Sequence, residues 1–257
     1  MSVEIDVRER IARITLNRPD VGNALDLELA TALRRAAEGL RGSDVGAVIV
    51  TGAGRAFCVG GDLHYMREAA SVGDAVLRLA TQFHGALAAL AELDAPVISA
   101  VRGAAAGGGM SLAIAADIVL AAESARFTMA YTAIGFSPDG GSSWTLPRLV
   151  GPRRAAELML LNERLDAAQA RALGLVTRVV ADEALDDEAA ALARRLADGP
   201  NRAHGAVKRL LRDSATRGFA AQMAEEARTI AALADGQDGR EGVAAFLEKR
   251  APRFGTR

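Results

Sequence analysis

One apolar stretch, residues 95–122, constrains this chain more than any other, because three consecutive glycines, Gly107–Gly109, lie inside it. Glycine costs about 1 kcal/mol per helix position relative to alanine, so a continuous helix through the triplet is disfavoured. Arg102 and Asp117 also interrupt the stretch, which argues against a membrane-spanning helix. We therefore expect a buried strand, a small-residue loop and then a helix that begins among the glycines.

Short runs rich in β-branched residues recur along the chain and predict strands. The predicted strands are Ile11–Leu16, Val45–Val50, Pro96–Val101, Ile118–Ala121 and Leu175–Val180. Between them, apolar residues at 3.6-residue spacing predict helices over residues 25–40 and 77–90. Strands that alternate with helices define an α/β fold, and continuous apolar strands suit a sheet covered on both faces.

The strand patterns end near Asp182, and the sequence is then helical to about Arg250, with breaks at Asp198–Asn201 and Ala234–Gly239. This change predicts two parts. An α/β core occupies residues 1–199, and a helical region occupies residues 200–257.

The composition of the chain excludes some classes of binding partner. Lys and Arg total 31 against 32 Asp and Glu, so a net charge of −1 offers no field for nucleic acid or an anionic membrane. The lone Cys58 rules out an intramolecular disulfide, and the charged N-terminus is unlike a signal peptide, so we expect a cytoplasmic protein. Three dispersed histidines and one cysteine give no metal-ligand cluster.

The glycine triplet allows two interpretations of equal weight. Glycines at a helix N-terminus expose backbone N–H groups that can hold an anion or a developing oxyanion. Small residues equally permit close helix packing. The dinucleotide-binding pattern G-x-G-x-x-G is absent from this loop.

Five motifs in order along the chain carry a family resemblance. They are LNRPDVGNALD (residues 16–26), GAGRAFCVGGDL (52–63), VRGAAAGGGMSLAIAADIVLAAESARF (101–127), RALGLVTRVV (171–180) and REGVAAFLEKRAPRF (240–254). Together they resemble the crotonase superfamily, also called enoyl-CoA hydratase/isomerase, from Leu16 to Phe254.

The resemblance implies a ClpP-like spiral of ββα units with a C-terminal helical trimerisation region, hence a homotrimer or a hexamer. It implies an acyl-CoA thioester substrate and no bound cofactor, since CoA belongs to the substrate. Its oxyanion-hole N–H groups would be those of Val59 and Gly108. The residues that resemble CoA-contacting positions are Ala24, Ala56, Gly60, Gly61, Asp62, Leu63, Phe246 and Lys249. Lys249 is equally well explained as an ordinary solvated helix charge.

Hydratases of this family carry two glutamates at positions where this chain has Ser111 and Tyr131. Neither side chain matches a carboxylate as acid or base at neutral pH, because an unassisted tyrosine has a pKa near 10. We therefore expect chemistry other than hydration. Ser111 would line the acyl pocket, and Tyr131 would donate a hydrogen bond there or simply pack.

Asp139, in the segment SPDGGSSW, lies where isomerases of the family carry an aspartate. One carboxylate suffices to move a proton between two carbons of an enoyl thioester, so the resemblance favours an enoyl-CoA isomerase. Without the resemblance, Pro-Asp-Gly-Gly would be interpreted as a turn.

Three alternatives remain. His84 and Asp139 are spaced as in aryl-CoA dehalogenases of the family, although a lone histidine on a helix is more often a packing or surface residue. A hydratase-like member is the second. A non-catalytic acyl-CoA binder is the third, and it predicts thioester binding without turnover.

Overall fold

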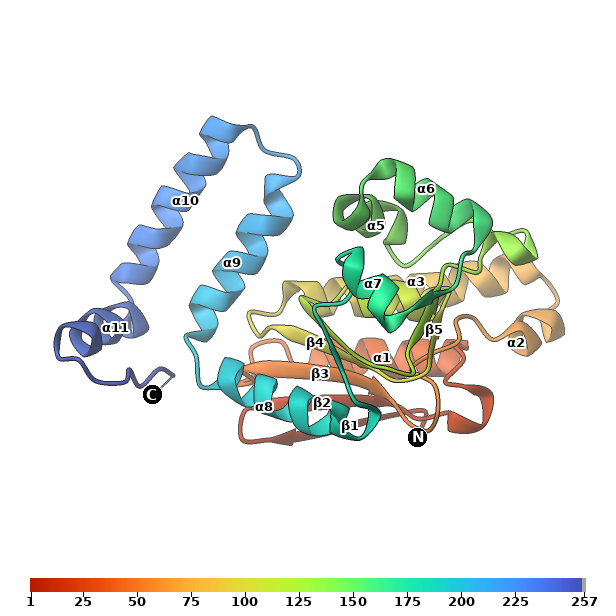
Figure 1. The fold of residues 1–257 in the computed structure, drawn as a ribbon, viewed down its shortest axis with the longest axis horizontal. Helices are drawn as coiled ribbons and strands as arrows, with labels where there is room; N and C mark the ends of the chain where they lie inside the picture. The colour runs from red at the N-terminus through yellow and green to blue at the C-terminus, as the bar shows by residue number, and fades with distance from the viewer. Residues whose placement is uncertain (256–257) are drawn as a thin grey trace.

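The computed structural model describes residues 1–255, and its centre is a six-stranded sheet in the order β1-β2-β3-β4-β6-β9 (Figure 1). The strands are β1 (Val3–Arg8), β2 (Ile11–Leu16), β3 (Ala47–Gly52), β4 (Val97–Val101), β6 (Ile118–Ala122) and β9 (Arg178–Val180). β1 pairs antiparallel with β2, and every later pair in this sheet is parallel. Five of the six strands coincide with the predicted runs; β1 was not predicted.

A second, three-stranded sheet in the order β5-β7-β8 lies beside the first. Its strands are β5 (Ala104–Ala106), β7 (Arg126–Thr128) and β8 (Leu165–Asp166). The chain repeatedly places one strand in the large sheet, the next in the small sheet, and then a helix, as in β4, β5 and α4 (Gly108–Ile114). This repeat is the predicted spiral of ββα units.

Helices cover both faces of the large sheet. α1 (Leu27–Gly39) and α3 (Val72–Glu92) pack together over one face, in a core that includes Leu33 and Phe83. α8 (Leu185–Ala197) covers the other face against Ile49 and Ile98. Because β3 and β4 are buried on both sides, their sequences are continuously apolar.

The remaining helices of the body are α2 (Leu63–Glu68), α5 (Ser142–Val150), α6 (Pro152–Leu161) and α7 (Ala167–Ala172). Short 3₁₀ turns occupy Pro19–Val21, Thr132–Ile134 and Asp182–Ala184. No helix of residues 1–255 is both long and apolar enough to cross a bilayer.

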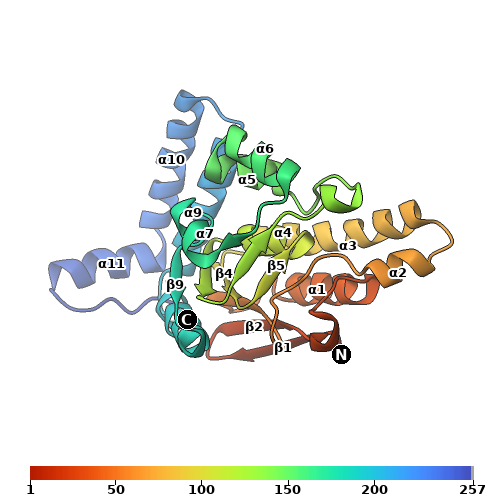
Figure 2. The ribbon, with the colours of Figure 1, turned by 45° about the vertical axis from the view of Figure 1, so that its right-hand side comes forward.

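The C-terminal part consists of α9 (Asn201–Ser214), α10 (Phe219–Ala234) and α11 (Gln237–Leu247). Figures 1 and 2 show α10 and α11 projecting away from the sheets, with α9 between them and the body. The predicted breaks at 198–201 and 234–239 separate α8 from α9 and α10 from α11, whereas the break at 215–218 was not predicted. The proposed boundary at 199/200 falls in the α8–α9 connection, and its role as a domain boundary stays a prediction.

Candidate active site

Two loops, residues 18–26 and 56–63, lie side by side at the start of the site. The Leu25 N–H donates to the Gly60 carbonyl at 2.7 Å, and the Asp62 N–H donates to the Leu25 carbonyl at 2.9 Å. The buried Asn23 side chain donates to the Ala56 carbonyl at 2.7 Å. The structure therefore brings together the segments that were predicted to hold CoA.

Arg18 ties these loops to the helices behind them. Its guanidinium lies 3.1 Å from Asp26 and 3.1 Å from Asp62, the N-cap residues of α1 and α2. Burial acts to raise the pKa of Asp62, but hydrogen bonds from the Tyr65 amide and Arg18 outweigh it, so the pKa is lowered. The Asp62 side chain is thus committed to holding the loop.

The glycine triplet is explained by both of its interpretations together. Gly107 has φ +51°, a conformation that favours glycine, and it precedes the first turn of α4. A Cβ on Gly109 would lie 2.0 Å from the Cys58 carbonyl oxygen, so α4 can approach the segment that contains Cys58 only with glycine at position 109. Close packing thereby fixes the N-terminus of α4, where backbone N–H groups lack helical acceptors.

The backbone amides of the two glycine-rich loops differ in availability. The Val59 N–H, predicted as an oxyanion donor, donates to the Gly22 carbonyl at 3.0 Å and is already occupied. This finding counts against the predicted role, because an N–H engaged in a hydrogen bond between the two loops cannot also hold a ligand oxygen. Among residues 1–255, neither the Gly61 N–H nor the Gly108 N–H has a hydrogen-bond acceptor. The Gly60–Gly61 pair was the sequence signal for this second amide, although it was assigned only to CoA contact.

Asp139 lies in a turn after the short helix Thr132–Ile134, and several residues hold it. The Tyr131 hydroxyl donates to its Oδ1 at 2.6 Å. The Ser111 hydroxyl lies 3.1 Å from the Asp139 backbone carbonyl and 3.0 Å from the Tyr131 hydroxyl. Burial and the Asp139 charge both raise the pKa of Tyr131, so the phenol stays protonated and remains a donor. Ser111 is almost fully buried behind this pair.

His84, on α3, meets the same turn from the other side. Its Nε2 accepts a hydrogen bond from the Gly140 N–H at 3.0 Å and lies 3.4 Å from Asp139 Oδ2. Gly140 has φ +61°, and a Cβ there would lie 2.7 Å from Phe83 and 2.8 Å from Ser111. The turn therefore packs too closely for any other residue at that position.

A cavity of about 560 Å³, here called the site cavity, contains Gly61, Gly108 and the Asp139 side chain in its wall. Most of the remaining wall is apolar, from residues that include Leu25, Met66, Val76, Leu79, Phe83 and Phe136. Two unpaired amides and one held carboxylate thus share one apolar space. Such a space can polarise a carbonyl oxygen and move a proton next to it.

The other predicted residues are distributed unequally. Val59, Gly60 and Leu63 line the site cavity, and Ala24 lies buried in the adjoining loop. Phe246 and Lys249 do not join them; both are exposed, in or just after α11. Figure 1 shows α11 and α2 at opposite ends of the molecule.

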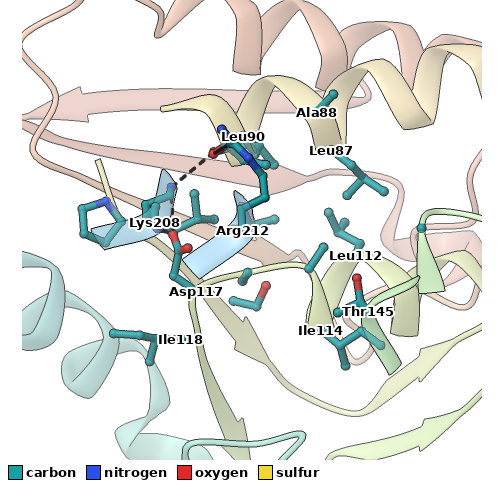
Figure 3. Close-up of a pocket in the computed structure, with 18 of the residues that line it drawn as sticks. Leu87, Ala88, Leu90, Leu112, Ile114, Asp117, Ile118, Thr145, Lys208 and Arg212 are labelled. Carbon is teal, nitrogen blue, oxygen red and sulfur yellow. Dashed lines mark hydrogen bonds and ion pairs between the residues drawn. The ribbon is translucent and has the colours of Figure 1, made fainter. Parts of the chain in front are cut away.

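A second cavity of about 830 Å³, here called the helix cavity, lies on the far side of the Asp139–Gly141 turn, between the body and α9. His84, Gly140 and Trp144 line it, and Trp144 does not line the site cavity. Figure 3 shows its Lys208–Asp117 ion pair, whose atoms are 2.8 Å apart. In the part of the chain described here, no three His, Cys, Asp or Glu side chains gather as metal ligands.

Comparison with known proteins defines the class of this fold and site. A solved enoyl-CoA hydratase from Mycobacterium smegmatis matches with a TM-score of 0.92 and 34% identity, covering 100% of both chains. The family model described as Enoyl-CoA hydratase/isomerase matches residues 6–257.

Two curated relatives agree with that match. One from Rhodobacter capsulatus, named probable enoyl-CoA hydratase, is 42% identical over 256 residues, with 98% of this chain and 97% of the relative covered. The 1,2-epoxyphenylacetyl-CoA isomerase of Escherichia coli is 39% identical over 254 residues, with 96% of each covered. The chain belongs to the enoyl-CoA hydratase/isomerase family, within the crotonase superfamily, and is an acyl-CoA enzyme.

Proposed function

We propose that this enzyme is an enoyl-CoA isomerase in which Asp139 moves the proton and the Gly61 and Gly108 amides hold the thioester oxygen. The observation that carries the proposal is the presence of one held carboxylate and two unpaired amides in the wall of one apolar cavity. At the two positions where hydratases of the family have glutamates, Ser111 and Tyr131 instead support Asp139. The isomerase name of the Escherichia coli relative is consistent with this chemistry.

The proton shift follows from these groups. Asp139 Oδ2 removes a proton from C2 of a 3-enoyl thioester, and the electron pair delocalises onto the thioester oxygen. The Gly61 and Gly108 N–H groups stabilise that dienolate, and one such donor typically contributes 10²- to 10³-fold in rate. The protonated Asp139 then returns the proton to C4, which leaves the double bond between C2 and C3. No bound cofactor is required for this reaction.

The cavity wall also indicates the acyl group. Asp139 is the only Asp, Glu, Lys, Arg or His among the described residues that line it. A terminal carboxylate on the acyl chain would lose its hydration there without meeting a cation, and it would face the Asp139 charge. We therefore propose an uncharged aliphatic or aromatic acyl group.

We also propose self-association as a homotrimer or a hexamer through the C-terminal helices. α10 buries none of its residues, yet its exposed side chains include Phe219 and Ile230. Phe246 on α11 is 83% exposed. Apolar surface of this kind is typical of an interface. Sedimentation equilibrium tests the proposal, and a monomer at micromolar concentration would contradict it.

The first experiment measures solvent deuterium exchange into 3-enoyl-, 2-enoyl- and arylacetyl-CoA thioesters, with the wild type beside Asp139→Asn. We expect exchange and double-bond migration in the wild type and a loss of about 10²- to 10⁴-fold in the variant, which is the range that general-base catalysis contributes. Asparagine keeps an acceptor for the Tyr131 hydroxyl, so thioester binding serves as the control. Binding without exchange in the wild type would favour a non-catalytic binder.

One observation favours a second candidate, an aryl-CoA dehalogenase: His84 Nε2 lies 3.4 Å from Asp139 Oδ2. In that reaction Asp139 attacks the ring carbon that bears the halogen, halide leaves, and water hydrolyses the resulting aryl ester. Release of halide from a haloaryl-CoA thioester tests it directly. Halide release that disappears in Asp139→Asn would replace the isomerase proposal.

A further inference from the structure

The His84 side chain, which comes from α3, forms a hydrogen bond with the backbone of the Asp139–Gly141 turn. The Gly140 N–H points at its Nε2, at 3.0 Å. A ring nitrogen that accepts a hydrogen bond carries no proton, so this contact fixes a neutral imidazole with its proton on Nδ1. The lone pair that could remove a proton from water is therefore already engaged.

The other face of the turn is held by hydroxyl groups. Ser142 Oγ lies 2.8 Å and Ser111 Oγ 3.1 Å from the Asp139 carbonyl oxygen, while the Tyr131 hydroxyl donates to Oδ1. Only Oδ2 is left without a donor, and it lies beside His84 Nε2. The backbone and one carboxylate oxygen are thus fixed, and the second oxygen is free to react.

We propose, on the basis of the isomerase function above, that His84 is a positioning residue that aims Asp139 Oδ2 at the substrate by accepting the Gly140 N–H. His84 has this role only in its neutral form. A protonated ring would offer an N–H to Oδ2 instead, which would both release Gly140 and occupy the reacting oxygen.

The charged groups around the ring set the conditions of the test. Asp139 is the ionisable group in direct contact with His84. On the opposite side the helix cavity contributes Asp117, His204, Lys208 and Arg212, of which Asp117 and Lys208 are paired with each other. A substitution at His84 alone leaves these groups in place, so it isolates the hydrogen bond to Gly140.

The matched variants are His84→Gln, whose amide oxygen can still accept the Gly140 N–H, and His84→Met, which cannot. We expect His84→Met to lower kcat about 10- to 100-fold with KM within about threefold, since small misplacements of a reacting group carry costs of this size. His84→Gln should keep kcat within about threefold.

A second readout does not depend on turnover. In full-length protein labelled with ¹⁵N-glycine and held at one pH, the Gly140 amide should exchange with solvent as slowly in His84→Gln as in the wild type and faster in His84→Met, which lacks the acceptor. Equal loss of kcat in both variants would show that the ring transfers protons and would overturn the proposal. An unchanged kcat in His84→Met, or a Gly140 amide that exchanges equally fast in His84→Met and in the wild type, would overturn it too. If no thioester isomerises, the isomerase proposal fails, while exchange of the Gly140 amide still decides whether His84 holds the turn.

Discussion

The two cavities on either side of the Asp139–Gly141 turn differ in how their polar groups are used. In the site cavity, the Gly61 and Gly108 amides are unpaired and Asp139 is held with one oxygen free. The helix cavity is larger, but Lys208 is committed to Asp117 and to the Ala95 carbonyl. Two unpaired backbone amides beside one held carboxylate, rather than volume, therefore set the site cavity apart as the space proposed to be reactive.

The largest expected effect concerns the packing that creates the unpaired amides. Gly109→Ala would place a Cβ 2.0 Å from the Cys58 carbonyl oxygen, so α4 must shift away from the strand. We expect a loss of about 3 kcal/mol or more in the free energy of unfolding, at the upper end for overpacking, together with loss of thioester binding. Urea denaturation measures the first quantity and calorimetry the second.

The control for that variant is Gly73→Ala, because Gly73 is a helix glycine that lines the site cavity and a Cβ there would meet no neighbouring heavy atom within 4 Å. Gly73 lies in α3, where alanine is the better helix former, so stability should stay equal or rise. A Gly109→Ala protein as stable as the control would contradict the account of the glycine triplet.

The next largest effect concerns the charge of the acyl group that the site cavity accepts. Adding a terminal carboxylate to an enoyl-CoA substrate should lower kcat/KM about 10²-fold, because the wall of the site cavity offers that charge no cation. The comparison uses two thioesters of equal chain length, one ending in a methyl group and one in a carboxylate. Equal kcat/KM values would mean that the acyl terminus leaves the cavity or meets a cation from another subunit.

The sequence predicts the large sheet well and the small sheet poorly, for a physical reason. Ile11–Leu16 alternates and carries β-branched residues, so its strand is encoded locally. Ala104–Ala106 has no strand preference, and it is a strand only because Cys58 and Phe127 pair with it. The helices α5 and α6 were not predicted either, although Pro152 at the start of α6 and Asn162 after its end are helix-boundary signals.

The residues of the candidate site also divide into those that the sequence predicts and those that only the structure reveals. The resemblance singles out Gly108, Tyr131 and Asp139, and all three line the site cavity. The choice between the Val59 and Gly61 amides depends on backbone direction, which Gly60 reverses at φ +95°. No residue type in the sequence reports that direction, so the structure was needed to find that Val59 donates to Gly22.

A moderate effect should come from the helix cavity, and it should appear in stability instead of rate. Lys208→Met removes the partner of Asp117, but Asp117 keeps the Val97 N–H at 2.8 Å and a side chain 31% exposed. We expect a loss of about 1–2 kcal/mol in the free energy of unfolding, below the 3–5 kcal/mol of a fully buried pair, with kcat within twofold. Arg209→Met, which removes the exposed pair with Asp94, should cost no more than about 0.5 kcal/mol. A fall in kcat of more than twofold in Lys208→Met, without the expected loss of stability, would show that the helix cavity takes part in the reaction.

The smallest expected effect is that of acid on the helix cavity. It should appear in the melting temperature Tm. Burial lowers the pKa of His204, in the wall of the helix cavity, below its ordinary value. The unfolded chain then binds that proton more readily than the folded one, so stability is lost as the pH falls below about 6.5, the unfolded value. The loss continues until the pH reaches the lowered pKa.

His204→Gln should therefore show a smaller drop in Tm between pH 7 and pH 5 than the wild type. His64→Gln, at an exposed position of α2, should not. In His204→Gln, kcat should stay within about twofold of the wild-type value, because His204 lines the helix cavity and not the site cavity.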